Sequence, residues 1–184
     1  MPSMKPRRTP RPLDENGLRD LGLAYVGRFA TTRHKLRQYL ERKIRERGWA
    51  GDRRPDVGAI ADRFAEQGYI DDSAFALAKA QALSARGYGK RRVLQTLKVA
   101  GVANEDGEAA CDHAEGEAVA AALRFAERRR IGPFGTGPAL DRKQREKALA
   151  AMMRAGHRLE IARAIVSLDP GSPVDADSLG GIGN

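Results

Sequence analysis

Basic side chains that could bind a polyanion recur in three stretches of the chain. Residues 33–47 hold seven Lys or Arg against two Glu, and residues 86–98 hold five with no acid among them. The third stretch comprises residues 128–130 and, beyond a glycine-rich loop, four more basic residues within 142–147. The candidate partner-binding residues are Lys35, Arg37, Arg42, Arg45, Arg86, Tyr88, Lys90, Arg91, Arg92, Lys98, Arg129, Arg130, Arg142 and Lys143. Such a set suits phosphate groups or an acidic protein surface.

The charge of the whole chain points the same way. Its 184 residues include 33 Lys or Arg against 24 Asp or Glu, a formal net charge of +9. This balance favours a polyanionic partner, either nucleic acid or a protein that carries it. The alternative is a charge that only keeps the protein soluble, because a charge run on one helix is usually a solvated face. The recurrence of basic residues in three stretches favours a polyanionic partner.

Catalytic chemistry finds little support in the sequence. His34, His113 and His157 are far apart and lack the spacing of metal ligands. Asp71 and Asp72 directly precede a predicted helix, where a carboxylate is expected to accept a hydrogen bond from an unpaired backbone N–H group. We therefore expect no enzymatic activity, no catalytic residues, no metal site and no cofactor.

Aromatic side chains are also sparse, with ten in the chain. Most fall on the apolar faces of predicted helices or in loops, so a stacking platform for single-stranded nucleic acid is not indicated. Tyr88 and Phe134, which lie in similar glycine-flanked loops, are the only candidates for such a contact, and local packing is the alternative for both.

The elements that carry these residues are predicted to be helices. Three proline-free spans, 13–54, 56–132 and 139–169, show apolar residues at helical spacing. No segment shows sustained alternation of apolar and polar residues, so no strands are expected. The predicted fold class is all-α.

An internal repeat organises these helices. In each of the segments 40–49, 93–102 and 148–157, two apolar residues four apart are followed four residues later by a glycine. The three glycines, Gly48, Gly101 and Gly156, are 53 and 55 residues apart. The pattern predicts tandem three-helix repeats that form an elongated, curved array, since each repeat would pack mainly on its neighbours.

The predicted domain boundaries follow from this repeat and from composition. The three repeats are assigned to residues 14–70, 71–115 and 116–169. Residues 1–13 form a basic, proline-rich tail and residues 170–184 a tail rich in Asp and Gly. Both tails have little apolar surface to offset their ordering entropy, so both are predicted to be disordered.

Cysteine content and hydropathy bear on location. Cys111 is the only cysteine, which rules out an intramolecular disulfide and fits a reducing, cytoplasmic location. No apolar run approaches the roughly 20 residues of a membrane span, and the N-terminus lacks the apolar core of a signal peptide. No exposed coiled-coil seam is evident. We expect a cytoplasmic monomer without membrane contact.

The middle of the chain resembles a known family. Residues 68–76 read Gly-Tyr-Ile-Asp-Asp-x-x-Phe-Ala, and residues 86–102 read Arg-Gly-x-Gly-x-x-Arg-Val-x-x-x-Leu-x-x-x-Gly-Val. This order resembles the signature of the RecX regulatory proteins, and the likeness extends more weakly over residues 18–168. Neither tail has a counterpart in it.

The resemblance implies tandem three-helix repeats and a regulator of the RecA recombinase. Such proteins bind the RecA–single-stranded-DNA filament and suppress its ATPase, strand exchange and coprotease activities, which modulates DNA recombination, DNA repair and the SOS response. Residues 86–98, where the match is best, would then be the main contact region. The alternative is a general nucleic-acid-binding helical repeat protein without specificity for a recombinase.

Overall fold

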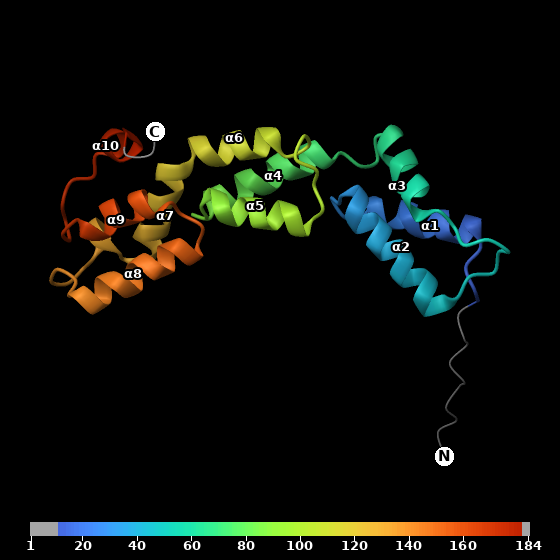
Figure 1. Cartoon of the computed structure of the whole chain (residues 1–184), viewed down its shortest axis with the longest axis horizontal. Coiled ribbons are helices and arrows are strands. Elements are labelled where there is room, and N and C mark those ends of the chain that lie inside the picture. The colour runs from blue at the N-terminus through green and yellow to red at the C-terminus, as the bar shows by residue number, and fades with distance from the viewer. Residues whose placement is uncertain (1–10, 182–184) are drawn as a thin grey trace, which may run out of the picture. The chain divides into compact units, whose positions relative to one another are not determined.

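The computed structural model describes residues 11–181, and these residues form helices joined by turns and loops (Figure 1). The helices are α1 (Glu15–Val26), α2 (Arg33–Arg47), α3 (Val57–Glu66), α4 (Asp72–Ala85), α5 (Lys90–Val99), α6 (Glu108–Gly116), α7 (Ala118–Arg129), the 3₁₀ turn η1 (Gly132–Phe134), α8 (Arg142–Arg154), α9 (Leu159–Ser167) and α10 (Ala176–Gly181). Within the described part of the chain, the only extended pairing is an isolated bridge between Leu13 and Trp49. The all-α prediction is confirmed.

The chain divides into two compact units between Asp72 and Ser73. The first unit contains α1 to α3, and the second contains α4 to α10 apart from the first residue of α4. The predicted array of three repeats, with its boundaries, stays a prediction.

The first unit is built around a small apolar core between its three helices. Leu18, Leu36, Leu40 and Phe64 are almost completely buried in it. Gly22 lets α1 approach α3 closely, because a Cβ atom there would lie 2.9 Å from the Phe64 ring. The helix starts are capped by the side chains of Asp14, Thr32 and Asp56, each of which accepts a hydrogen bond from a backbone N–H of the first turn.

Asp72 supplies a further cap in this unit. Its buried carboxylate accepts one hydrogen bond from the backbone N–H of Arg33, at 3.0 Å, and another from the Arg33 Nε, at 2.9 Å. A capping role was expected for this residue, but the N–H group that it accepts from belongs to α2 and not to the helix that Asp72 begins. The bond ties the end of the first unit to the start of α2.

In the second unit, a glycine turn joins the helices of two predicted repeats. The Gly89 N–H donates to the Ala155 carbonyl at 3.0 Å, and the Arg91 N–H donates to the Gly156 carbonyl at 3.2 Å. A Cβ atom on Gly89 would lie 2.3 Å from the Gly156 oxygen, so only glycine allows this approach. We call these two main-chain bonds the α5–α8 joint. It holds the start of α5 against the end of α8.

A buried histidine lies beside this joint. His157 Nε2 lies 3.2 Å from the Gly87 carbonyl, and the imidazole packs against the Phe125 ring with the ring centroids 5.4 Å apart. Burial lowers the pKa of His157 to about 4, although the contact with the Gly87 carbonyl opposes the shift. The imidazole is therefore neutral at physiological pH, and Nε2 carries the proton that is donated to Gly87.

The structure corrects the predicted tails where it describes them. Residues 170–181 were expected to be disordered, but they contain α10, whose Leu179 is buried in the core formed with α7 and α9. The partly buried Val174 packs against the same core, and the Gly171 N–H donates to the Pro133 carbonyl at 2.9 Å. At the other end, Leu13 is buried beside Trp49, where its N–H donates to the Gly48 carbonyl and its carbonyl accepts from the Ala50 N–H, both at 2.9 Å. A few such contacts hold a segment whose average composition is polar. Residues 1–10 and 182–184 lie outside the described residues.

Candidate partner-binding surface

Helix α5 carries three of the five basic residues of the middle stretch on the side that faces solvent. Its buried side is formed by Val93 and Leu97, four residues apart. Arg91, Arg92 and Lys98 are exposed. Among the described residues, Arg91 and Lys98 make no ion pair, so both charges are available to a partner. We call the exposed side of α5 the α5 basic face.

Two further predicted residues, Tyr88 and Arg86, flank this face. The guanidinium of Arg92 lies over the Tyr88 ring, 6.0 Å from its centroid, and donates to Gln95 at 3.3 Å. Tyr88 is half-buried and packs against the core below it, so local packing accounts for part of its surface. Arg86 is exposed, and its carbonyl accepts a hydrogen bond from the Arg128 guanidinium.

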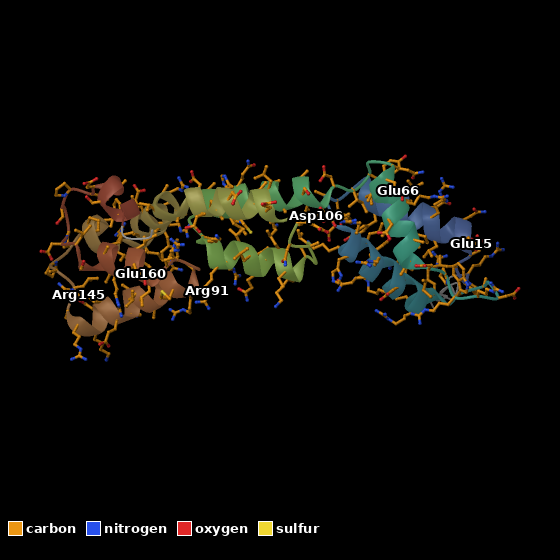
Figure 2. All side chains as sticks on the ribbon, turned by 45° about the horizontal axis from the view of Figure 1, so that its top comes forward. Glu15, Glu66, Arg91, Asp106, Arg145 and Glu160 are labelled. Atoms are coloured by element: carbon orange, nitrogen blue, oxygen red, sulfur yellow. The ribbon has the colours of Figure 1, made fainter. Side chains whose placement is uncertain are left out.

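A hollow of about 300 Å³ opens where the α5 basic face meets the end of α8. It is lined by Arg91, Arg92, Gln95, Met153, Arg154 and Gly156. The side chain of Arg91 can be followed in Figure 2. Three arginine residues thus line one opening, and arginine side chains bind phosphate or carboxylate through paired N–H donors. We call this opening the arginine hollow.

The sequence gives no signal for Arg154 as a member of this site. It lies in the last turn of α8, 56 residues beyond Lys98, and nothing in the helical pattern says which helix ends meet. The α5–α8 joint brings it into place.

Lys90 has a different role from its neighbours. Its Nζ lies 2.8 Å from Glu115 Oε2, and the other oxygen of Glu115 lies 2.9 Å from the Arg158 guanidinium. The hydrogen bond from Lys90 and the nearby charge of Arg158 lower the pKa of Glu115, so this carboxylate stays ionised. Lys90 therefore links α5 to α6 within the protein and is not part of the α5 basic face.

The predicted residues of the third stretch fall into two separate places. Arg129 and Arg130 are exposed at the end of α7, where the Arg129 guanidinium lies 5.7 Å from the Phe125 ring centroid. Arg142 and Lys143 are exposed at the start of α8, and Arg142 pairs with Glu146 at 3.1 Å. The start of α8 is roughly 18 Å from the end that borders the arginine hollow, at 1.5 Å per residue.

The predicted residues of the first stretch lie on α2 in the first compact unit. Arg37, Arg42 and Arg45 are exposed and Lys35 is half-buried. Arg42 lies 3.6 Å from Glu46 and its guanidinium is 5.5 Å from the centroid of the Tyr39 ring. The joining of these residues with the α5 basic face into one stripe stays a prediction.

Between residues 11 and 181 no three His, Cys, Asp or Glu side chains are grouped so that they could hold a metal ion. None of the helices in that range is long and apolar enough to span a membrane.

The comparisons with known proteins decide the family. Over 169 residues the chain is 31% identical to Regulatory protein RecX of Myxococcus xanthus strain DK1622, a match that covers 88% of this chain and 90% of that protein. The chain belongs to the RecX regulatory protein family. Regulatory protein RecX of Halorhodospira halophila strain DSM 244 / SL1 is 29% identical over 147 residues, which cover 80% of this chain and 84% of the relative. No family model matches the chain.

A solved structure shows the same fold for this RecX family member. The crystal structure of RecX from Lactobacillus salivarius superposes with a TM-score of 0.58, covering 82% of this chain and 93% of the other, at 16% sequence identity. The resemblance of residues 68–102 to the RecX signature is thus confirmed as family membership.

Proposed function

We propose that this protein binds the RecA–single-stranded-DNA filament and inhibits its ATPase, strand exchange and coprotease activities, as a cytoplasmic monomer and not as an enzyme. The observation that carries the proposal is the family, because both relatives are named regulatory proteins and the match to the first spans 88% of this chain. In a cell, such an activity would limit recombination and the SOS response.

The α5 basic face is a physically suitable contact for such a filament. Arg91, Arg92 and Lys98 project from one short helix, and Arg154 adds a fourth cation across the arginine hollow. DNA phosphates and acidic protein side chains both pair with guanidinium groups. Several modest contacts along one filament would add up to strong binding, because each one raises the effective concentration of the next.

The test is the ATPase of the recombinase on single-stranded DNA, titrated with this protein. A filament regulator inhibits at amounts well below those needed to cover the DNA lattice. Inhibition only when the strand is coated would instead support the general nucleic-acid-binding protein, since simple competition requires occupied lattice. The matched control adds an unrelated basic protein of similar charge at the same molar ratio.

A further inference from the structure

Three aromatic rings lie in a row on the surface of the first compact unit. The rings of Tyr25 on α1 and Tyr39 on α2 are stacked, with centroids 4.2 Å apart and planes 15° from parallel. Phe29 lies four residues beyond Tyr25, just after the end of α1, and extends the row with a centroid distance of 5.4 Å and its ring tilted by 49° from that of Tyr25. We call Phe29, Tyr25 and Tyr39 the aromatic row. Sequence spacing predicted no such platform, because Tyr25 and Tyr39 come from different helices.

Two cations adjoin the inner end of the row. Arg42 Cζ and Lys43 Nζ lie 5.5 Å and 5.8 Å from the centroid of the Tyr39 ring. Both approach the same carboxylate, Glu46, whose pKa is lowered by the hydrogen bond from Lys43. Two positive charges against one negative charge leave this end of the row net positive.

Packing of the core does not account for Phe29, which is 55% exposed at the outer end of the row. Tyr69, in the same compact unit, is equally exposed at 55%, but it packs edge-on against the buried Phe64, and within residues 11–181 no cation lies over its ring. Phe29 thus differs from Tyr69 in its neighbours, which are other partly exposed rings. It ends a row of rings that leads to two cations.

We propose that the aromatic row binds single-stranded DNA, with an unpaired base stacked on Phe29 and the neighbouring phosphates drawn to Arg42 and Lys43. Rings that stack on bases beside cations that meet the backbone are how single strands are held without sequence preference, since every base has a π face. A duplex cannot use the row, because its bases are already stacked. The choice of DNA as the nucleic acid rests on the proposed function.

The first test measures binding of the full-length protein to a fluorescein-labelled oligothymidylate without any recombinase. Phe29→Leu keeps an apolar side chain but removes the π face, and it should weaken binding about tenfold. Phe29→Trp should restore or strengthen binding. Tyr69→Leu is the matched control, with the same exposed fraction at the start, and should bind like the unchanged protein. Circular dichroism checks that each variant is folded.

A second measurement locates the contact directly. An oligonucleotide containing 5-iodouridine, irradiated in complex with the protein, crosslinks to aromatic side chains that stack on the halogenated base. The crosslinked peptide should contain Phe29 or Tyr25. Equal affinity of Phe29→Leu and the unchanged protein, or crosslinks confined to peptides outside residues 15–47, would overturn the proposal.

The outcome separates this inference from the proposed function. If Phe29→Leu leaves strand binding unchanged while the protein still inhibits the recombinase ATPase, the aromatic row is not the site and the proposed function stands. If the strand binds on the row but the ATPase is unaffected at every ratio, the proposed function fails and the aromatic row remains a single-strand site.

Discussion

Protonation of His157 is expected to loosen the second compact unit. The imidazole is buried, it donates from Nε2 to the Gly87 carbonyl, and its Nδ1 has no hydrogen-bond partner within residues 11–181. The Phe125 ring against which it packs already has the guanidinium groups of Arg128 and Arg129 over it, at 5.6 Å and 5.7 Å from its centroid. A second proton would place an unpaired positive charge in this dry, already positive environment.

The size and sign of the effect follow from the two pKa values. The folded imidazole has a pKa of about 4, against 6.5 for an unperturbed histidine. Between these values the unfolded chain binds a proton that the folded chain does not, so the free energy of unfolding falls as the pH falls from about 6.5 to about 4. The full stabilisation is present above pH 6.5. At 1.36 kcal/mol for each pH unit of that difference, the loss is about 2 kcal/mol at pH 5 and about 3 kcal/mol at pH 4.

Urea unfolding followed by circular dichroism at pH 7.5, 6 and 5 measures this loss. His157→Gln keeps an N–H donor for Gly87 but cannot titrate, so its stability should change little over this range. His34→Gln, at a half-exposed histidine of the first unit, is the control and should keep the slope of the unchanged protein. The carboxylates with lowered pKa values, Glu46 and Glu115, titrate below this range.

Trp49, the only tryptophan, lies in the first compact unit and provides an internal control. Its fluorescence reports the unfolding of that unit, so its midpoint should move less with pH than the circular dichroism midpoint. The reasoning would be refuted by equal slopes for the unchanged protein and His157→Gln between pH 7.5 and pH 5.

Three further outcomes are expected. Changing Arg91 and Lys98 together to Glu should leave the helical content unchanged, because both side chains are exposed. The double variant should inhibit the recombinase less, and the salt slope of its DNA binding should fall by about 1.4 units if both residues contact phosphates of a single strand. Full inhibition at ordinary salt would place the contact elsewhere. Asp72→Ala should cost about 1–3 kcal/mol in urea unfolding detected at Trp49, since it removes two bonds to Arg33; an unchanged midpoint would show that this cap is dispensable. Gly89→Ala should destabilise the second unit by about 1–3 kcal/mol through the backbone clash in the α5–α8 joint; an unchanged melting temperature would contradict the close approach.

Local chemistry made the helices predictable from the sequence. Apolar spacing such as Val93 to Leu97 identified α5 and its buried side. The glycines that mark the repeat, Gly48, Gly101 and Gly156, all have positive φ angles of 69° to 95°, which explains why glycine ends each helix. The exposed positions of Arg91 and Lys98 followed from the same helical wheel.

Contacts between distant segments could not be predicted in the same way. A period identifies the buried face of a helix but not the helix that it meets, so the bond of Asp72 to Arg33, 39 residues away, left no local trace. The same holds for Arg154 in the arginine hollow. Lys90 looked like its basic neighbours in sequence, and only the position of Glu115 on α6 distinguishes it.

The α5–α8 joint has a consequence for how sequences of this family can diverge. Its hydrogen bonds run between main-chain atoms. Folding therefore requires glycine at positions 89 and 156, where a Cβ atom would clash, but it does not require arginine at positions 91 and 154. Glycines that persist among relatives would therefore record the architecture. Arginines that persist around the hollow would record selection by a partner, because the fold itself does not require them.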